Sequence, residues 1–375
     1  MRRAGAAAER LPADLAAGLS FSQLPALDGI RAVAAFLVVF YHFGVPRVSG
    51  NLGVLIFFVL SGFLITWLLL KEDEKFGSVS LRQFYARRAL RIFPAFYCYW
   101  GLLMLLGLAR NASIHWDQAI AALFYFNNYF QAIHGDPNTG LSHTWSLAIE
   151  EQFYLLWPMT FLAFRQNYFR LSRLLAGAVV AIWVYREVLH FVFHVPQGYI
   201  YEAFDTRADH LAMGCLLAVV LRAGIGGGFW RRMCTLKASA AAALLLTAST
   251  LLESRYGTPY RDTIGFVIEP VLVAVLIAQL IALRGTLAWA WLNWPWMRYL
   301  GRISYSVYLY QQITVGPAKK LLAAFPAFVQ LGGTAAVVVL VASGSYFFIE
   351  RPFLKWKDRF HRRAHTASAA LPVRS

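Results

Sequence analysis

Residues 51–70, NLGVLIFFVLSGFLITWLLL, are twenty consecutive positions without a charged side chain. An α-helix rises about 1.5 Å per residue, so this run is long enough to cross the roughly 30 Å hydrocarbon core of a bilayer. Nine further long apolar runs, which carry few charged side chains, lie at 28–46, 90–109, 142–164, 173–194, 208–222, 237–253, 264–283, 302–319 and 327–350. The sequence therefore predicts an all-α integral membrane protein of about ten transmembrane helices. A shorter stretch, 117–131, is predicted to be re-entrant or interfacial.

The composition excludes an ordinary soluble domain. The 375 residues are 59% hydrophobic and 14% charged, whereas soluble domains carry about 25% charged residues. The net charge is +16, from 35 Lys and Arg against 19 Asp and Glu. In a membrane protein such an excess orients the chain, so we expect no nucleic-acid partner. The three cysteines, Cys98, Cys215 and Cys234, have no ligand-like spacing, which predicts neither a disulfide framework nor a metal site.

The basic residues also predict the orientation. Ten crossings place both termini on one side, and 26 of the 35 Lys and Arg residues fall on that side, against 8 on the other side or at the outer helix ends. This asymmetry favours cytoplasmic termini in a multi-pass protein of the cytoplasmic (inner) membrane. We expect residues 1–24 to be a cytoplasmic tail without a cleaved signal peptide, 25–357 a single transmembrane domain, and 358–375 a basic, disordered tail.

The first run carries two ionisable side chains eleven residues apart, Arg31 and His42. Eleven residues at about 100° each end about 20° past three full turns, so both side chains share one helix face, roughly 16 Å apart along the axis. They are either a boundary arginine and an interfacial histidine, or a relay. In the relay, Arg31 holds an anion near the cytoplasm and His42 is a general base deeper in the membrane, a gap about as long as a pantetheine arm. Asp28 can cap this helix and pair with Arg31.

Two adjacent carboxylates, Glu150 and Glu151, lie in the fourth run. They point about 100° apart on a helix, so at least one must face a polar interior. The run crosses the membrane in the opposite direction to the first, which puts Glu150 at about the depth of His42. Glu150 is therefore a candidate to orient the imidazole, and the structural alternative is a carboxylate paired with Arg or Lys at the rim.

Small and basic residues provide further candidates. Ser61 and Gly62 lie near the middle of the 51–70 run, where small residues mean either close helix packing or room for a narrow acyl channel. Arg88 and Arg91 share a helix face, which suits either cytoplasmic anchoring or phosphate binding. Glu350, at the end of the last run, is predicted to pair with Arg88 or Arg91 as a structural contact.

Two pairs of polar residues begin later runs. Arg207 and Asp209 open the run at 208–222 and are predicted to form a local ion pair. Ser304 and Tyr305 open the run at 302–319 and place hydroxyl groups on one helix face. Neither pair alone distinguishes a structural role from a binding role.

The motifs, taken in order, resemble those of the membrane-bound acyltransferase-3 family, and the resemblance covers about residues 24–357. The matching segments are LDGIRAVAAFLVVFYHF, GVLIFFVLSGFLIT, FYARRALRIFP, HTWSLAIEEQFYLLWP, TRADHLAMG, LGRISYSVYLY and FIERPF. The resemblance implies transfer of an acyl group, usually acetyl from acetyl-CoA, to a hydroxyl of a sugar-containing acceptor such as a surface polysaccharide. It implies no metal. The esterase-like extension of some family members is not expected here.

The resemblance also implies roles for individual residues. The family's Arg-x10-His motif falls on Arg31 and His42, and its Arg-x-x-Arg motif on Arg88 and Arg91. The expected roles are then catalysis by His42 with Glu150; acyl-CoA binding by Arg31, Arg88, Arg91, Ser61 and Gly62; acceptor binding by Trp145, Arg207, Asp209, Ser304 and Tyr305; and structural support from Asp28, Glu350 and Pro352. The chain departs from many members at Leu55, where they have an acidic residue, and at Gln311, where they have histidine.

Two other functions remain open at this point. A transporter that exports an anionic lipid-linked saccharide would use the same polar interior, although it would predict two related halves with broken helices. A structural membrane scaffold would tolerate loss of Arg31 and His42. The sequence indicates neither the acceptor, nor the acyl chain length, nor the oligomeric state.

Overall fold

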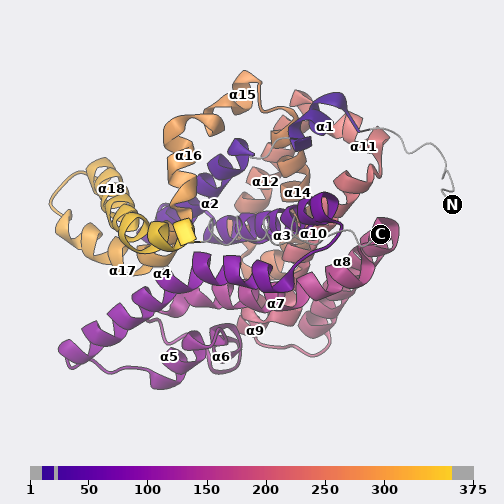
Figure 1. Cartoon of the computed structure of the whole chain (residues 1–375). Helices are drawn as coiled ribbons and strands as arrows, with labels where there is room; N and C mark the ends of the chain where they lie inside the picture. Colours follow the sequence, from indigo (N-terminus) through magenta and orange to yellow (C-terminus); the bar gives the residue numbers. More distant parts are fainter. Residues whose placement is uncertain (1–10, 21–23, 357–375) are drawn as a thin grey trace.

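A computed structural model describes residues 11–20 and 24–356, and every regular element in them is helical (Figure 1). This confirms the all-α fold class. The helices that match the ten predicted runs are α2 (Pro25–Phe43), α3 (Gly50–Phe76), α4 (Leu81–Ala109), α7 (Trp145–Phe164), α8 (Tyr168–Phe191), α10 (Phe204–Ala223), α12 (Leu236–Tyr256), α14 (Phe266–Ala282), α17 (Ser304–Leu321) and α18 (Ala327–Ser345).

Shorter elements connect these helices. They are α1 (Ala13–Ser20), α5 (Trp116–Leu123), α6 (Asn127–His134), η1 (Ser142–Thr144), α9 (Gln197–Glu202), α11 (Gly227–Met233), α13 (Thr258–Tyr260), α15 (Leu287–Ala290), η3 (Trp291–Asn293), α16 (Pro295–Arg302) and two π-helical segments, η2 (Arg261–Gly265) and η4 (Tyr346–Glu350). Helix α1 packs on α14. The remainder of the predicted N-terminal tail at 1–10 and 21–23, and the predicted tail at 358–375, lie outside the described residues.

The predicted count of ten spans is not reproduced in full. In the part of the chain that the structure describes, seven helices are long and apolar enough to cross a membrane. An eighth is added if the pair Gln197–Ala223 and Gly227–Met233, bent by 113°, counts as one span. Helices α7 and α17 occupy predicted runs but do not reach the required apolarity. Helix α7 carries Glu150 and Glu151, and α17 is rich in hydroxyl and amide side chains.

The stretch at 117–131 does not form one continuous helix. It is divided between α5 and α6, each of eight residues. Eight residues rise only about 12 Å, well short of a membrane crossing. The polar face of α6 is buried instead, and Asn127 donates hydrogen bonds to the Leu141 carbonyl (3.0 Å) and the Thr144 hydroxyl (2.8 Å).

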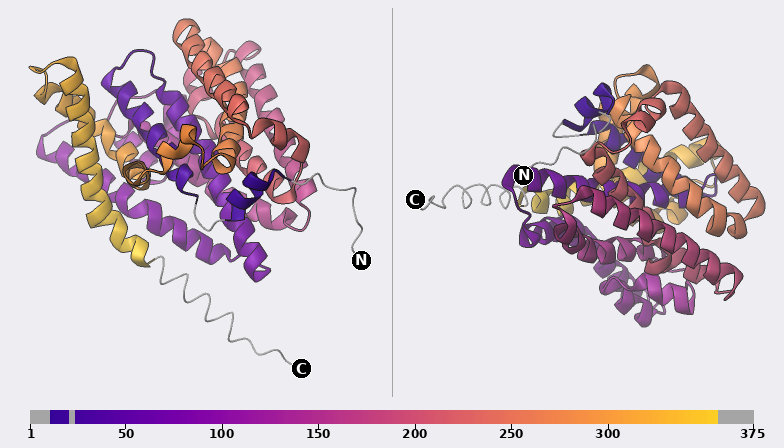
Figure 2. Two further views of the ribbon diagram at one scale, coloured as in Figure 1. Left: turned by 90° about the horizontal axis from the view of Figure 1, so that it is seen from above. Right: turned by 90° about the vertical axis from the view of Figure 1, so that its right-hand side faces the viewer.

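Helix α3 is the centre of the bundle, packed against α2 on one side and α10 on another. Figure 2 shows α18 at one edge of the molecule, away from α12 and α14. The α3–α10 contact depends on two glycines. A methyl group at Gly62 would lie 1.9 Å from the Leu211 carbonyl oxygen, and one at Gly214 would lie 1.9 Å from the Val59 carbonyl oxygen. Gly62 therefore serves close helix packing, the first of its two predicted roles, and it lines neither of the two cavities described below.

Candidate functional site

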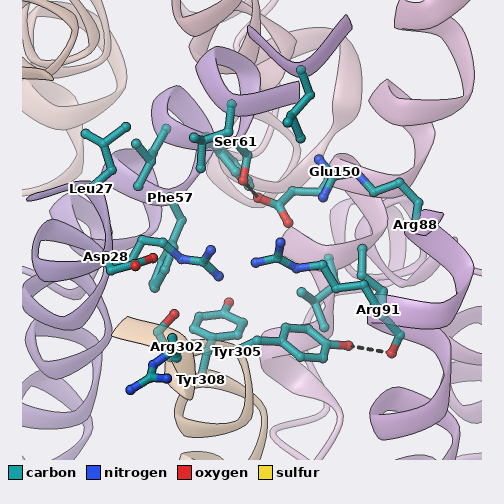
Figure 3. A pocket seen from close by; sticks show the side chains of 18 of the residues that line it. Leu27, Asp28, Phe57, Ser61, Arg88, Arg91, Glu150, Arg302, Tyr305 and Tyr308 are labelled. Atoms are coloured by element: carbon teal, nitrogen blue, oxygen red, sulfur yellow. Dashed lines mark hydrogen bonds between the residues drawn. The ribbon is translucent and has the colours of Figure 1, made fainter. Parts of the chain in front are cut away.

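A cavity of about 750 Å³ lies between α2, α3, α4, α7, α16 and α17 (Figure 3). On α3 its lining runs from Val54 to Lys71, which lie seventeen positions and about 26 Å apart along the helix. Its basic lining residues are Arg31, Lys71, Arg88, Arg91, Arg298 and Arg302, and its acidic ones are Asp28, Glu150, Glu151 and Glu350. We call it the arginine cavity. It brings together residues from both ends of the sequence.

Three guanidinium groups in this cavity have no hydrogen-bonded or ion-paired partner in the part of the chain that the structure describes. Within residues 11–20 and 24–356, Arg31, Arg88 and Arg91 form no hydrogen bond and no ion pair with a protein group. The guanidinium carbon of Arg88 lies 3.9 Å from the ring centroid of Tyr154. The neighbouring Arg87 is different, because it is paired with Glu72 at 2.5 Å. Three clustered, unpaired cations form a site for a multiply charged anion such as a phosphate or pyrophosphate.

Two of the four carboxyl groups that line the arginine cavity are held by hydroxyl groups. Glu150 accepts a hydrogen bond from the Ser61 hydroxyl at 2.7 Å, and Glu350 accepts one from the Ser306 hydroxyl. In the described residues no ion pair within 4.0 Å joins Glu350 to Arg88 or Arg91, although Glu350 interacts electrostatically with Arg91 over a longer distance. A hydroxyl on α17 takes the place of the expected cation. The arginines consequently stay available for a ligand.

A second cavity of about 570 Å³ contains His42, and we call it the histidine cavity. Its charged and ring-nitrogen lining residues are His42, Arg47, Asp136, His143, Glu202, Glu253 and Arg261. Trp145 and Tyr201 add an aromatic wall, with ring centroids 4.9 Å apart. Val54 and Tyr308 line both cavities. These two side chains therefore form part of the partition between them.

Tyr308 is fixed in the partition by two contacts to the chain around α7. Its hydroxyl donates to the His143 carbonyl at 3.0 Å and lies 2.5 Å from the Ser146 hydroxyl. The ring of His143 packs edge-on against Tyr308, with centroids 5.4 Å apart. Both ring nitrogens of His143 are buried and have no hydrogen-bond partner among the described groups. The sequence showed His143 within the HTWSL segment but gave no reason to assign it a role.

The imidazole of His42 is oriented by its own helix. Its Nδ1 lies 2.9 Å from the carbonyl oxygen of Val38, one turn earlier in α2. A carbonyl can only accept, so Nδ1 carries the proton in the neutral ring and Nε2 keeps its lone pair. Glu150 lines the arginine cavity instead, and no hydrogen bond joins it to His42 in the described residues. The predicted orientation of His42 by Glu150 is therefore wrong.

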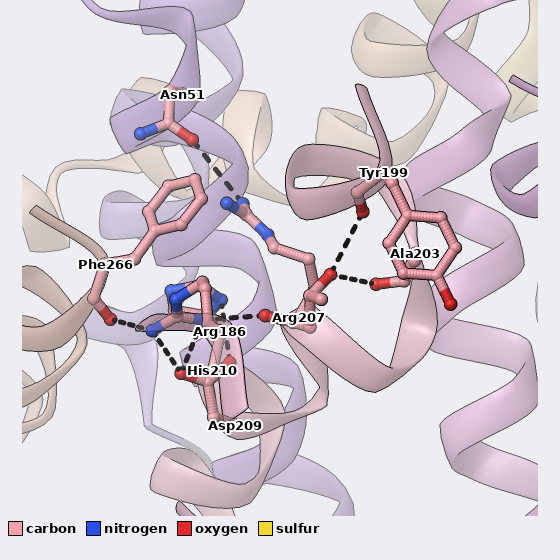
Figure 4. A network of polar contacts seen from close by, with 9 residues as sticks. Asn51, Arg186, Tyr199, Ala203, Arg207, Asp209, His210 and Phe266 are labelled. Atoms are coloured by element: carbon pink, nitrogen blue, oxygen red, sulfur yellow. Dashed lines mark hydrogen bonds and ion pairs between the residues drawn. The ribbon is translucent and has the colours of Figure 1, made fainter. Parts of the chain in front are cut away.

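The predicted pair Arg207 and Asp209 is also arranged differently (Figure 4). Asp209 pairs with Arg186, whose two terminal nitrogens both lie 3.1 Å from one carboxylate oxygen. Arg207 is fully buried, 3.9 Å from the Phe266 ring centroid, and donates a long 3.5 Å hydrogen bond to Asn51. Neither Arg207 nor Asp209 lines a described cavity. Arg207 lies behind the aromatic wall of the histidine cavity, with its guanidinium carbon 5.1 Å from the ring centroid of Tyr201 and 5.8 Å from that of Trp145.

The remaining predicted residues divide between the two cavities, the packed interior and, for Pro352, the exposed surface. Trp145 lines the histidine cavity, whereas Ser304 and Tyr305 line the arginine cavity with Asp28. The Tyr305 hydroxyl donates to the Ile92 carbonyl at 3.0 Å. The two departures from the family pattern, Leu55 and Gln311, and the predicted structural residue Pro352 line neither cavity.

The comparisons with known proteins agree on one family. A family model described as an acyltransferase domain matches residues 24–348. Among curated proteins, YrhL of Bacillus subtilis is 32% identical over 363 residues, which cover 88% of this chain and 54% of YrhL. The peptidoglycan O-acetyltransferase OatA of Listeria monocytogenes is 30% identical, over 88% of this chain and 56% of its own.

A third relative matches a shorter region. The O-acetyltransferase OatA of Staphylococcus aureus is 36% identical over 219 residues, which cover 52% of this chain and 34% of that protein. The chain thus spans about half the length of the first two curated relatives. No solved structure gives a significant match.

Proposed function

The chain belongs to the acyltransferase-3 family, and from this premise we propose that it is a membrane O-acyltransferase. It moves an acyl group, acetyl in the simplest case, from acyl-CoA to a hydroxyl of a sugar-containing acceptor. One observation carries the proposal: a cavity lined by unpaired arginines and a cavity containing a histidine share a partition at Val54 and Tyr308. This arrangement suits a donor and an acceptor that enter from opposite sides and meet near the partition.

The arginine cavity is the proposed donor site. The unpaired guanidinium groups of Arg31, Arg88 and Arg91 match the phosphates of coenzyme A in charge and hydrogen-bonding capacity. Because coenzyme A is a cytoplasmic molecule, this assignment puts the arginine cavity, and with it both chain termini, on the cytoplasmic side. The roughly 16 Å between Arg31 and His42 along α2 is comparable to the pantetheine arm.

The histidine cavity is the proposed acceptor site. The Nε2 atom of His42 takes the proton from an acceptor hydroxyl. The hydroxyl oxygen then attacks the thioester carbonyl carbon, the carbon–sulfur bond breaks, and the coenzyme A thiolate leaves and takes up the proton that His42 had accepted. The carboxylates Asp136, Glu202 and Glu253 offer hydrogen-bond acceptors to sugar hydroxyls, and Trp145 offers an apolar face. The name of the Listeria monocytogenes relative, a peptidoglycan O-acetyltransferase, supports a cell-wall glycan as the acceptor class.

The test uses the purified full chain in lipid nanodiscs with radiolabelled acetyl-CoA and isolated peptidoglycan fragments. We expect label to move to the glycan and coenzyme A to be released. His42→Ala should lower transfer by roughly 10²–10⁴-fold, the usual contribution of a general base, and leave coenzyme A binding unchanged. His190→Ala, on the outer part of α8, is the matched control.

Two results would contradict the proposal. One is full transfer by His42→Ala. The other is export of a lipid-linked saccharide by the wild type with no release of coenzyme A, which would favour the transporter. Label retained on the wild-type protein after denaturation, and absent from His42→Ala, would indicate an acyl-histidine intermediate instead of direct transfer.

A further inference from the structure

Two further arginines line the arginine cavity from a different element. Arg298 and Arg302 lie on α16, four residues apart and therefore on one helix face. In the described part of the chain neither forms a hydrogen bond or an ion pair with a protein group, and the guanidinium of Arg302 lies 6.0 Å from the Tyr299 ring centroid. Two unpaired guanidinium groups on one face constitute a second anion-binding position in the same cavity.

The packing of α16 on α2 determines where this second position lies. The two backbones meet at Gly301 and Asp28, because a methyl group at Gly301 would lie only 1.9 Å from the Asp28 carbonyl oxygen. Asp28 precedes Arg31 by three residues, about 4.5 Å along the axis of α2. The crossing therefore lies beyond Arg31 on the side away from His42. Figure 3 shows Arg302 near Asp28, across the pocket from Arg88 and Arg91.

The order of these groups along α2 matches the order of the chemical groups in coenzyme A. His42 is followed after roughly 16 Å by Arg31, and after about 4.5 Å more by the α16 crossing with Arg298 and Arg302. In coenzyme A the thiol is followed by the pantetheine arm, the pyrophosphate and then the ribose with its 3′-phosphate. If the pyrophosphate lies against Arg31, Arg88 and Arg91, the 3′-phosphate falls beside α16.

We propose that Arg298 and Arg302 bind the ribose 3′-phosphate, so that the site selects 3′-phosphorylated coenzyme A over donors that lack this group. This inference rests on the proposed function. Asp28 lines the same cavity and interacts electrostatically with arginines of both groups, namely Arg31, Arg91, Arg298 and Arg302. Its negative charge lowers the mutual repulsion of the arginines before the donor arrives, although it also weakens the attraction for phosphate.

Binding of coenzyme A and of 3′-dephospho-coenzyme A to the full chain in nanodiscs, measured by calorimetry, tests this proposal. We expect the wild type to bind coenzyme A at least about tenfold more tightly, as charge-assisted hydrogen bonds to one phosphate would give. In the double variant Arg298→Gln/Arg302→Gln the two ligands should bind equally, at the affinity of the wild type for the dephosphorylated form. Arg31→Gln should weaken both ligands alike, and Arg87→Gln, whose arginine is paired with Glu72, should change neither.

Equal affinity of the wild type for both ligands would overturn the 3′-phosphate site while leaving the donor proposal intact. An equal fold-decrease in the affinity for both ligands in the double variant would also overturn the 3′-phosphate site and leave the donor proposal intact. Binding of neither ligand by the wild type would overturn the donor assignment itself. Competition on the wild type alone avoids any folding defect of the variant: adenosine 3′,5′-bisphosphate should displace coenzyme A better than adenosine 5′-monophosphate, and equal displacement would count against the proposal.

Discussion

At the scale of single residues, helical spacing predicts which side chains face a common interior but not which cavity they reach. Arg31, Arg88 and Arg91 were placed on suitable helix faces by spacing alone, and the structure collects them in one cavity. Glu150 was matched to His42 only by depth in the membrane. Depth follows from counting residues along each helix, whereas the azimuth around the helix depends on packing, and packing turns Glu150 toward Ser61.

The contact that orients His42 was also not predicted from the sequence. The hydrogen bond from Nδ1 to the Val38 carbonyl needs no partner from another helix. It could have been anticipated from the spacing of four residues, since that carbonyl lies one turn away. The acidic pair in the fourth run offered a more conspicuous partner. A local backbone contact is easily overlooked when distant carboxylates are available in the sequence.

Tyr308 is the residue at which the partition can be tested. Tyr308→Phe keeps the ring but removes the hydroxyl that contacts His143 and Ser146. We expect this variant to loosen the partition and admit water to the thioester, which raises the ratio of acetyl-CoA hydrolysis to glycan transfer. The loss of stability should be only about 0.5–1.5 kcal/mol, the usual net value of a hydrogen bond.

The matched control is Tyr299→Phe. Its hydroxyl lies 2.7 Å from the Ser343 hydroxyl, and Tyr299 lines neither cavity. Both variants lose one hydroxyl, but only Tyr308→Phe should change the ratio of hydrolysis to transfer. An unchanged ratio in Tyr308→Phe, or the same rise in both variants, would show that Tyr308 does not separate donor from acceptor.

At the scale of helices, the apolar runs predicted where the long helices lie. The criterion of length and apolarity for a membrane span, however, is not met by two helices that line the arginine cavity. Helices α7 and α17 were located as runs, yet they are too polar to count as spans by composition alone. Helix α7 contributes Glu150 and Glu151 to the arginine cavity, and α17 contributes Ser304, Tyr305 and Tyr308. A helix that supplies polar side chains to an interior cavity necessarily has a lower mean hydropathy than a helix that faces only lipid.

The close contact of α3 with α10 predicts an element-scale effect on stability. Gly214→Ala places a methyl group 1.9 Å from the Val59 carbonyl oxygen, so the helices must separate. Overpacking of this kind typically costs about 1–3 kcal/mol. We expect a lower midpoint in thermal unfolding of the detergent-solubilised protein.

Gly177→Ala provides the comparison for this effect. Gly177 lies inside α8, and a methyl group there would meet nothing within 4 Å. Alanine in a helix interior is favoured over glycine by about 0.5–1 kcal/mol, so this variant should unfold at the same or a higher temperature. Equal destabilisation by both substitutions would mean that the α3–α10 contact is not tightly packed at Gly214.

At the scale of the whole molecule, the position of the two cavities defines two faces, and the distribution of basic residues predicts which face is cytoplasmic. The arginine cavity is lined on α3 as far as Lys71, near the C-terminal end of that helix, whereas the histidine cavity is lined by Ser49, Gly50 and Asn51 at its start. The positions of the Lys and Arg residues between the apolar runs predicted how many basic residues lie on each side of the membrane. They could not predict the cavities, because these form only when helices distant in sequence pack together.

Helix α4 provides a direct test of this orientation, because its two ends are exposed on opposite faces. Ser78 precedes α4 and Ser113 follows it, and both are exposed. We expect Ser113→Cys to react with a membrane-impermeant maleimide in intact cells, and Ser78→Cys to react only after the membrane is permeabilised. The two variants carry the same substitution and the same background cysteines, so each is the control for the other. Labelling of Ser78→Cys but not Ser113→Cys in intact cells would invert the molecule, and the arginine cavity would then face away from the cytoplasmic pool of coenzyme A.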